Sequence, residues 1–279
     1  MPRTIRGSFA VVPVVLACLL LFAGGLASPF SASSKPQVAL HALDGLGVPN
    51  QPVTIEAKLV RLSGTKESTL PGELLELVVG GAVQTSATTD TEGKARLIYV
   101  PKRKGIVHAT IRTAATASIE AATTAYVVAW ERRTPLLAVE TASLYGESEL
   151  EVPAADAADE LGKLTQFYFN VIYVRSLRDS REDLFRAATL VRAWLQEHKF
   201  PAGYVLVLPS GDAGLGNAID ELRLQGWTTL KVGVARKKAF AEAFLERRLE
   251  AIIVPEPAKG EAPRKAKTAK NWKDVRKKL

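Results

Sequence analysis

Cysteine is almost absent from this sequence of 279 residues, and the single one is Cys18 in an apolar N-terminal segment. The rest of the chain can therefore form neither a disulfide nor a metal site built on thiolates. Histidine is scarce as well: His41, His108 and His198 are too scattered along the chain to suggest a shared metal ion. From these absences we expect neither a metal-ligand set nor a cofactor.

Acidic residues are fewer than basic ones, 29 against 37, which gives a net charge of +8. Residues 259–279 carry nine Lys or Arg and two acids, a net +7 (nine minus two), so the rest of the chain is close to neutral. This composition predicts a basic disordered tail over 258–279, with anionic lipid or cell-wall polymer as its partner rather than nucleic acid. The residues expected to contact that partner are Lys265, Lys267, Lys270, Lys273, Arg276, Lys277 and Lys278.

A long apolar run without charged residues follows Arg3 and Arg6 at the N-terminus. This pattern is typical of a secretory signal peptide over 1–27, and the run is nearly long enough to be an uncleaved membrane anchor instead. Lipidation at Cys18 is a third alternative. In each case we expect an exported protein, periplasmic, extracellular or anchored to the membrane, with a Ser- and Pro-rich linker over 28–36.

Helical periodicity is missing from residues 37–132, where short apolar runs alternate with glycine-containing turns. This pattern predicts an all-β sandwich. The run from Thr88 to Ala95 resembles the hairpin of bacterial immunoglobulin-like and transthyretin-like modules, which implies a spacer or adhesion role. The strands expected from the apolar runs are Val53–Val60, Leu74–Val79, Val83–Thr88, Ala95–Val100, Ile106–Thr113 and Ile119–Val128.

From residue 133 to 257 the pattern changes to short apolar runs that alternate with amphipathic helices. It predicts a second domain, an α/β doubly wound parallel sheet of five strands. The run from Leu230 to Val234, the turn Ala235–Lys238, the helix after it and the next strand Ile252–Val254 form one βαβ unit. That turn holds three cations and no carboxylate, at a place where such sheets bind ligands.

Three motifs in this second half resemble those of the haloacid dehalogenase (HAD) superfamily, most closely the lipin/Nir C-terminal and actin-patch-type phosphatidate phosphatase branch. They are the strand Asn170–Val174, the segment His198–Leu206 and the segment Val232–Phe244, in that order. The resemblance implies a HAD-like Rossmannoid fold and Mg²⁺-dependent phosphoryl transfer.

The same resemblance places Glu140 where the family has its aspartate nucleophile and Ala142 where it has the general acid/base. Glutamate is one methylene longer, and alanine can transfer no proton. A misplaced nucleophile and a missing acid/base each lower the reaction rate, and the two losses multiply. We therefore assign no catalytic residue and expect a pseudoenzyme rather than a phosphatase.

Arg175 or Ser176 falls at the family's Ser/Thr position, and Arg236 with Phe240 matches its acidic metal-binding pair; the family's lysine has no clear counterpart. We expect no metal ligand here, while Glu140, Arg175, Ser176 and Arg236 are candidates for binding a ligand. The arginines could pair with Glu140 and close the cleft, which we favour, or bind an anion directly.

Three functions remain open from the sequence. The first is an exported, catalytically inactive HAD-like protein with a binding or structural role in the cell envelope. The second is a phosphatase with Glu140 as an atypical nucleophile, which alone would need Mg²⁺, or a hydrolase using the loop Ser210–Asn217. The third is binding of an envelope polymer or anionic lipid through the basic tail.

Overall fold

The computed structural model describes residues 37–64, 66–146, 152–210 and 213–279. The predicted signal peptide or anchor over 1–27, the linker over 28–36 and the lipidation alternative at Cys18 lie outside the described residues. Among the described residues, no helix is both long and apolar enough to cross a membrane.

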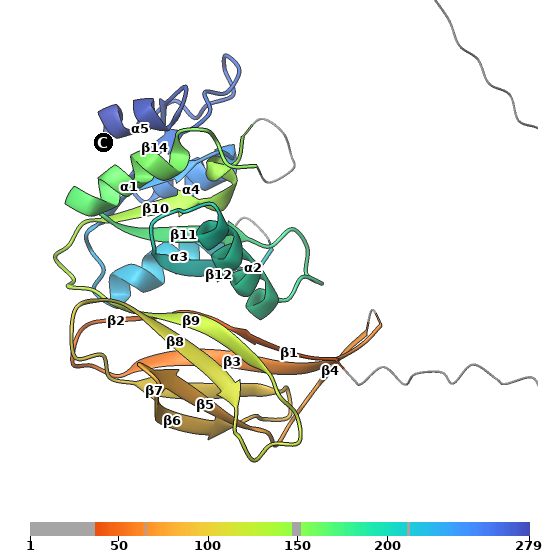
Figure 1. Ribbon diagram of the computed structural model, residues 1–279. Helices are drawn as coiled ribbons and strands as arrows, with labels where there is room; N and C mark the ends of the chain where they lie inside the picture. Colours follow the sequence, from red (N-terminus) through yellow and green to blue (C-terminus); the bar gives the residue numbers. More distant parts are fainter. Residues whose placement is uncertain (1–36, 65, 147–151, 211–212) are drawn as a thin grey trace, which may run out of the picture. The chain divides into compact units, whose positions relative to one another are not determined.

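The first part of the described chain is a β-sandwich of two sheets (Figure 1). Residues of β3 alternate between buried and exposed positions, so one face of its sheet lies against the other sheet. This arrangement confirms the sandwich predicted from the sequence. One sheet contains β1 (Gln37–Ala42), β3 (Val53–Ser63), β4 (Lys66–Thr69) and β7 (Lys94–Tyr99); the other contains β2 (Gly45–Gly47), β5 (Leu74–Val79), β6 (Ala82–Thr88), β8 (Gly105–Thr113) and β9 (Ala122–Ala129).

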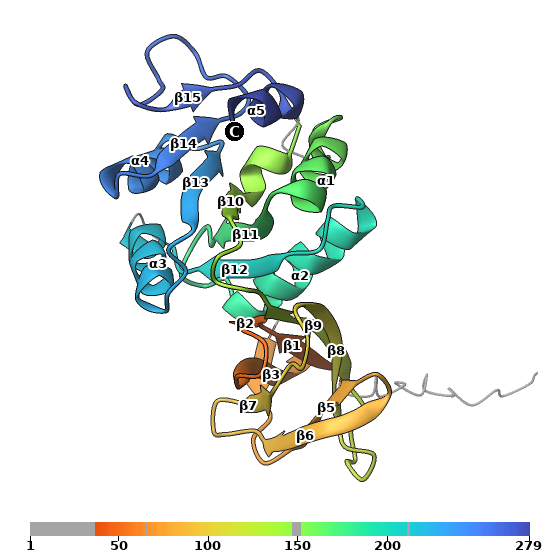
Figure 2. The same ribbon diagram turned by 90° about the vertical axis from the view of Figure 1, so that its left-hand side faces the viewer.

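The second part is a parallel sheet in the order β12-β11-β10-β13-β14-β15 (Figure 2). In chain order this is 3-2-1-4-5-6, the arrangement of a doubly wound sheet. The prediction of five strands was short by one, because it did not include β15. The strands are β10 (Leu136–Glu140), β11 (Asn170–Ser176), β12 (Tyr204–Leu208), β13 (Leu230–Ala235), β14 (Glu250–Ile253) and β15 (Lys267–Thr268).

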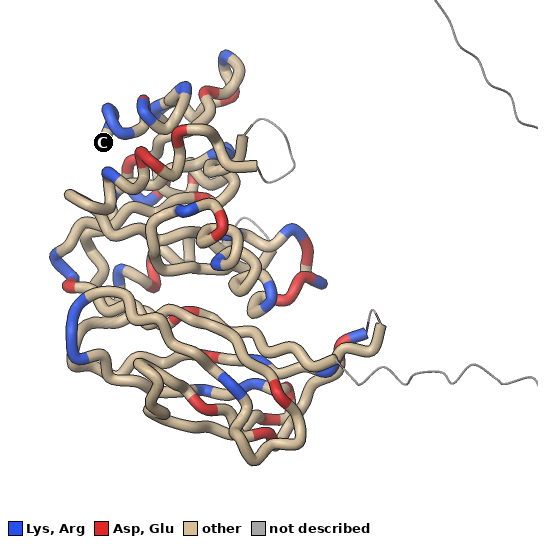
Figure 3. The backbone as a smooth tube through the Cα atoms, in the orientation of Figure 1, with Lys and Arg blue, Asp and Glu red and all other residues tan. Residues whose placement is uncertain are grey.

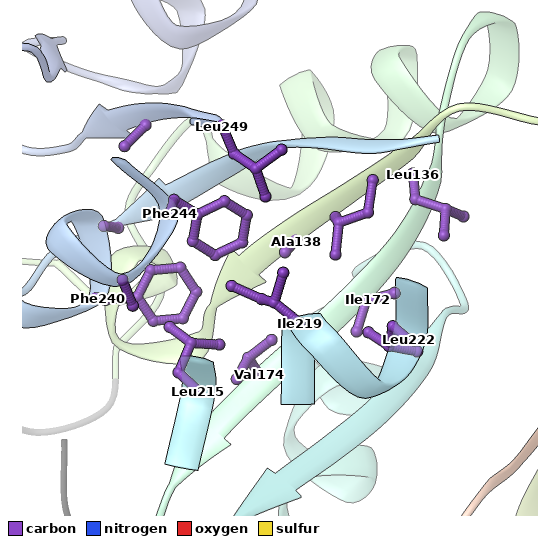
Figure 4. Packing of buried hydrophobic residues seen from close by; sticks show 14 of the residues in the cluster. Leu136, Ala138, Ile172, Val174, Leu215, Ile219, Leu222, Phe240, Phe244 and Leu249 are labelled. Carbon is purple, nitrogen blue, oxygen red and sulfur yellow. The ribbon is translucent and has the colours of Figure 1, made fainter. Parts of the chain in front are cut away.

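Helices cover both faces of this sheet because successive residues of each strand point to opposite sides. Leu136 and Ala138 of β10 pack with α3 and α4 (Figure 4), while Leu137 and Val139 pack with α1, α2 and α5. At Gly233 of β13 a side chain would collide with the ring of Phe244, so glycine allows α4 to approach the sheet. The helices are α1 (Ala157–Phe167), α2 (Leu184–Glu197), α3 (Ala213–Leu224), α4 (Lys238–Glu246) and α5 (Trp272–Lys278), with a short 3₁₀ helix, η1 (Thr141–Leu144), after β10.

The C-terminal segment is folded, so the prediction of a disordered tail over 258–279 was wrong. Trp272 and Val275 of α5 are fully buried beneath the sheet, and Ala269 is buried beside them. Figure 3 marks the Lys and Arg positions of this segment along the backbone. Three of the seven cations expected to bind a partner form ion pairs within the chain: Lys267 with Glu250, Arg276 with Glu160 and Lys278 with Asp274.

A buried ion pair joins the sandwich to the α/β part. Asp44, which follows β1, accepts a hydrogen bond of 2.8 Å from Nη1 of Arg192 on α2, and the two side chains are 0% and 2% exposed. The other Asp44 oxygen accepts from the backbone N–H of Val205 on β12. Arg192 also donates to the carbonyl of Ala42. One carboxylate therefore connects β1, α2 and β12, and we refer to this contact as the junction.

Candidate functional site

The candidate site is a pocket of about 360 Å³ at the carboxyl ends of β10, β11 and β13. The strand order reverses between β10 and β13, and ligands of doubly wound sheets bind outside the strand ends at such a switch point. All the ligand-binding candidates named from the sequence line this one pocket. Its described lining residues are Glu140, Thr141, Ala142, Tyr145, Gly146, Arg175, Ser176, Arg178, Arg236 and Lys237.

Glu140 ends β10 and is only 6% exposed. Its Oε2 accepts hydrogen bonds from the backbone N–H groups of Arg236 and Lys237, at 2.7 and 2.9 Å. Lys237 is the N-cap of α4, so the carboxylate lies where the helix dipole favours negative charge. Burial raises the pKa of Glu140, and the two N–H groups and the nearby cations oppose that rise.

The guanidinium of Arg236 points to the other wall of the pocket. Its Nη1 donates to the carbonyls of Tyr145 and Gly146, at 3.0 and 2.9 Å, and more weakly to that of Ala142 at 3.4 Å. These three carbonyls belong to η1 and the residues after it. The hydrogen bonds of Arg236 therefore hold the segment that follows β10 against the end of β13.

Arg175, near the end of β11, forms an ion pair of 3.2 Å with Glu182. Glu182 also accepts the backbone N–H of Arg178, so the loop after β11 is tied back to the strand. Ser176 follows Arg175 in the strand, and both line the pocket. Both positions reach the cavity, so the choice between them as the family's Ser/Thr position stays a prediction.

The ion pair predicted between Glu140 and the arginines is not formed by any of the residues that the structure describes. The guanidinium of Arg236 donates to carbonyls and that of Arg175 to Glu182, while Glu140 is satisfied by backbone N–H groups. Phe240, which matches the second position of the family's acidic pair, packs in the core: it is buried, and its ring stacks on that of Phe244 at 5.4 Å.

Sequence reasoning missed Arg178, Tyr145 and Gly146 as pocket residues. Arg178 could have been found, because the loop after each parallel strand lies at the same edge of the sheet. The carbonyls of Tyr145 and Gly146 carry no signal in the side-chain pattern. Their role depends on the path of the backbone after η1.

Asp183, at the start of α2, has a structural role. Asp183 is the N-cap of α2 and accepts the N–H groups of Phe185 and Arg186, which accounts for it structurally. Residues 211 and 212 of the loop Ser210–Asn217 lie outside the described residues. Within the described part of the chain, no three His, Cys, Asp or Glu residues come together as a metal site.

The charge of the pocket determines what it can hold. Four basic side chains, from Arg175, Arg178, Arg236 and Lys237, line it together with one acid, Glu140, among the described residues. Guanidinium groups bind carboxylate and phosphate oxygens with two parallel hydrogen bonds. Ala142 offers no group for proton transfer. The arrangement suits binding of an anion.

No protein-family model matches the chain, and no curated protein matches it. Among solved structures, D,D-heptose 1,7-bisphosphate phosphatase from B. bronchiseptica is 16% identical, covers 52% of this chain and 98% of its own, and has a TM-score of 0.41. The corresponding enzyme from Burkholderia thailandensis is 12% identical, with coverages of 52% and 97% and a TM-score of 0.38. The CARDB domain of PF1109 from Pyrococcus furiosus is 18% identical, with coverages of 34% and 94% and a TM-score of 0.22. All three scores lie below 0.5, and nothing about activity follows from them.

Proposed function

We propose that the protein binds an anionic ligand of the phosphate or phosphate-ester class in this pocket and does not turn it over. The observation that carries the proposal is the set of four basic side chains at the switch point of the sheet, with Glu140 as the one acid among the described lining residues. The volume of about 360 Å³ is within the range of small-molecule sites. The ligand would bring the negative charge that the pocket lacks.

Direct titration tests this proposal. Isothermal titration calorimetry of the full chain with inorganic phosphate, a phosphate monoester and a soluble short-chain phosphatidic acid would separate free phosphate from a lipid headgroup. We expect saturable binding that weakens as salt is added. In the double variant Arg178→Ala/Lys237→Ala, we expect affinity to fall by about tenfold, if each partly exposed charge contributes up to ~1 kcal/mol.

Lys231→Ala is the matched control, because Lys231 is an exposed cation near the start of β13, and Arg236 directly follows the other end of that strand. Its affinity for phosphate should equal that of the wild type. Equal affinities in the double variant and the control, or no saturable binding at all, would contradict the proposal.

We further propose that the α/β part is a HAD-like domain of the lipin branch that has lost its catalytic groups. The support is the position of Glu140 and Ala142 at the end of the first strand together with the order of the three sequence motifs. The rival function is a phosphatase with Glu140 as nucleophile. Mg²⁺-dependent turnover of a phosphate ester that is lost in Glu140→Gln would establish the rival and refute the inactive form.

An exported, envelope-associated location remains our proposal from the 1–27 pattern, and cell fractionation of the full chain tests it.

The second proposed partner, an anionic lipid or cell-wall polymer, now has a folded surface to contact. Of the seven cations expected to contact it, four are exposed and outside the ion pairs: Lys265, Lys270, Lys273 and Lys277. Replacing these four by Gln should shorten retention on an anionic-polymer column; unchanged retention would exclude this surface.

A further inference from the structure

The last helix of the chain reaches the segment that carries the pocket. Trp272, the first residue of α5, is fully buried, and its Nε1 donates a hydrogen bond of 3.0 Å to the carbonyl oxygen of Ser143 in η1. The two residues are 129 positions apart in the sequence. A buried indole N–H and a buried carbonyl satisfy each other here, and each would be left unpaired without the other.

The 3₁₀ helix η1 in turn holds both sides of the pocket. The Ser143 hydroxyl donates to the carbonyl of Glu140 at 2.7 Å. On the other side, the carbonyls of Ala142 and Tyr145 accept from the guanidinium of Arg236. The position of η1 therefore fixes where Glu140 leaves its strand and where the Arg236 charge is held.

Helix α5 is itself anchored at more than one point. The backbone N–H of Lys273 donates to Asp156 just before α1, at 2.8 Å, and Arg276 forms an ion pair with Glu160 of α1. Asn271 caps the helix by accepting the N–H of Asp274. Trp272 is thus presented to η1 by a structured segment rather than by a loose chain end.

We propose that Trp272 is a positioning residue of the anion pocket, and that its N–H sets the pocket's affinity for phosphate by holding η1 in place. This inference rests on the proposed binding of phosphate. It assigns to the C-terminal segment a part in ligand binding, although no residue of that segment lines the described pocket.

The experiment compares two tryptophans that are equally buried. Trp272→Phe keeps an aromatic ring and removes the N–H donor. Trp227→Phe is the matched control, since Trp227 is 2% exposed in the apolar cluster on the opposite face of the sheet. Each full-length variant is titrated with inorganic phosphate, and its unfolding by urea is recorded beside the titration.

We expect both variants to lose stability, but only Trp272→Phe to bind phosphate more weakly, by about fivefold, the effect of one net hydrogen bond. In the NMR spectrum of the wild type, the Trp272 indole N–H resonance should shift when phosphate is added. In a cycle with Ser143→Ala, the effects on affinity should be non-additive, because both changes release η1.

Equal affinities in Trp272→Phe and Trp227→Phe, with the wild type binding phosphate, would overturn the positioning role and leave the pocket intact. If the wild type binds no phosphate, the proposed function fails separately. The positioning role is then judged on backbone amide exchange of Ser143 and Tyr145 in the free protein. Unchanged exchange in Trp272→Phe would overturn it, and faster exchange confined to η1 would support it.

Discussion

Asp44 at the junction and Glu140 in the pocket are both buried carboxylates, but their charges are compensated by different groups. Asp44 lies against the guanidinium of Arg192, and backbone N–H groups of Tyr126 and Val205 complete its hydrogen bonds. Glu140 accepts only backbone N–H groups among the described residues, at the start of α4. Burial raises the pKa of both carboxyl groups.

The difference separates a structural contact from a site. At the junction the cation is paired with the acid and cannot reach a ligand, since Arg192 and Asp44 are almost completely excluded from water. In the pocket the acid is satisfied by the backbone, while Arg175 pairs with Glu182 and Arg236 donates to carbonyls. Arg178 and Lys237, which have no ion pair among the described residues, are left to face the cavity. Because Glu140 needs no cation as a partner, the unpaired basic side chains of the pocket can bind an anionic ligand.

Breaking the junction should have the largest effect. In Arg192→Met, Asp44 stays buried without a counterion, which typically costs 3–5 kcal/mol, so we expect the free energy of unfolding to fall by about that amount. Urea unfolding followed by fluorescence and by circular dichroism measures it. Arg186→Met on the same helix is the control: its pair with Glu67 is largely exposed and should contribute less than about 1 kcal/mol. A loss no larger than the control's would mean that the junction is not essential.

Removing both charges of the junction should lower the free energy of unfolding less than removing the arginine alone. In Asp44→Asn/Arg192→Met the buried carboxylate no longer lacks a partner, so we expect the double variant to be more stable than Arg192→Met by about 1–3 kcal/mol. The same urea experiment gives this difference. Additive losses would show that Asp44 acts through its backbone contacts rather than through its charge.

Local sequence patterns predicted much of the fold but not its long-range contacts. The strand Leu74–Val79 was predicted with the bounds that the structure shows. Helix α5 was missed because its cations dominate the composition, while Trp272 and Val275 at i and i+3 form a buried stripe too short to register as periodic. The pair of Asp44 with Arg192 spans 148 positions, and no local pattern contains it.

The sequence predicted which residues line the site but not which hydrogen bonds they form. Glu140 ends β10, Arg175 is the penultimate residue of β11 and Arg236 directly follows β13, so the topology alone brings them to one edge of the sheet. Which atom pairs with which was not predictable. The guanidinium of Arg236 binds carbonyls rather than Glu140 because η1 turns back across the strand ends, and that turn is set by tertiary packing.

Titration of Glu140 should sharpen the comparison, because its folded-state pKa is raised by burial above the ordinary 4.5. A raised carboxyl pKa gives stability that is full below pH 4.5 and is lost as pH rises through the folded-state value. Relative to the wild type, Glu140→Gln should therefore become more stable as pH increases from 4 to 8. Thermal unfolding of both proteins across this range measures the difference. A difference that stays constant would show that Glu140 does not titrate abnormally.

His41 of β1 should give a smaller effect of opposite sign. It is half-buried, its Nδ1 has no hydrogen-bond partner among the described residues, and burial lowers its pKa below 6.5. The groups that act on it are Asp183 and Glu67, which raise the pKa, and Arg186 and Lys58, which lower it.

A lowered histidine pKa gives stability that is full above pH 6.5 and is lost as pH falls through that value toward the folded-state pKa. His41→Gln should therefore gain stability relative to the wild type between pH 7 and 5, while Glu140→Gln loses its relative advantage over the same interval. Because the two trends oppose each other, the pH dependence of the wild type alone does not separate them. The single variants, unfolded in parallel at each pH, separate them, and two variants with slopes of the same sign would contradict the assignment of one titrating group to each region.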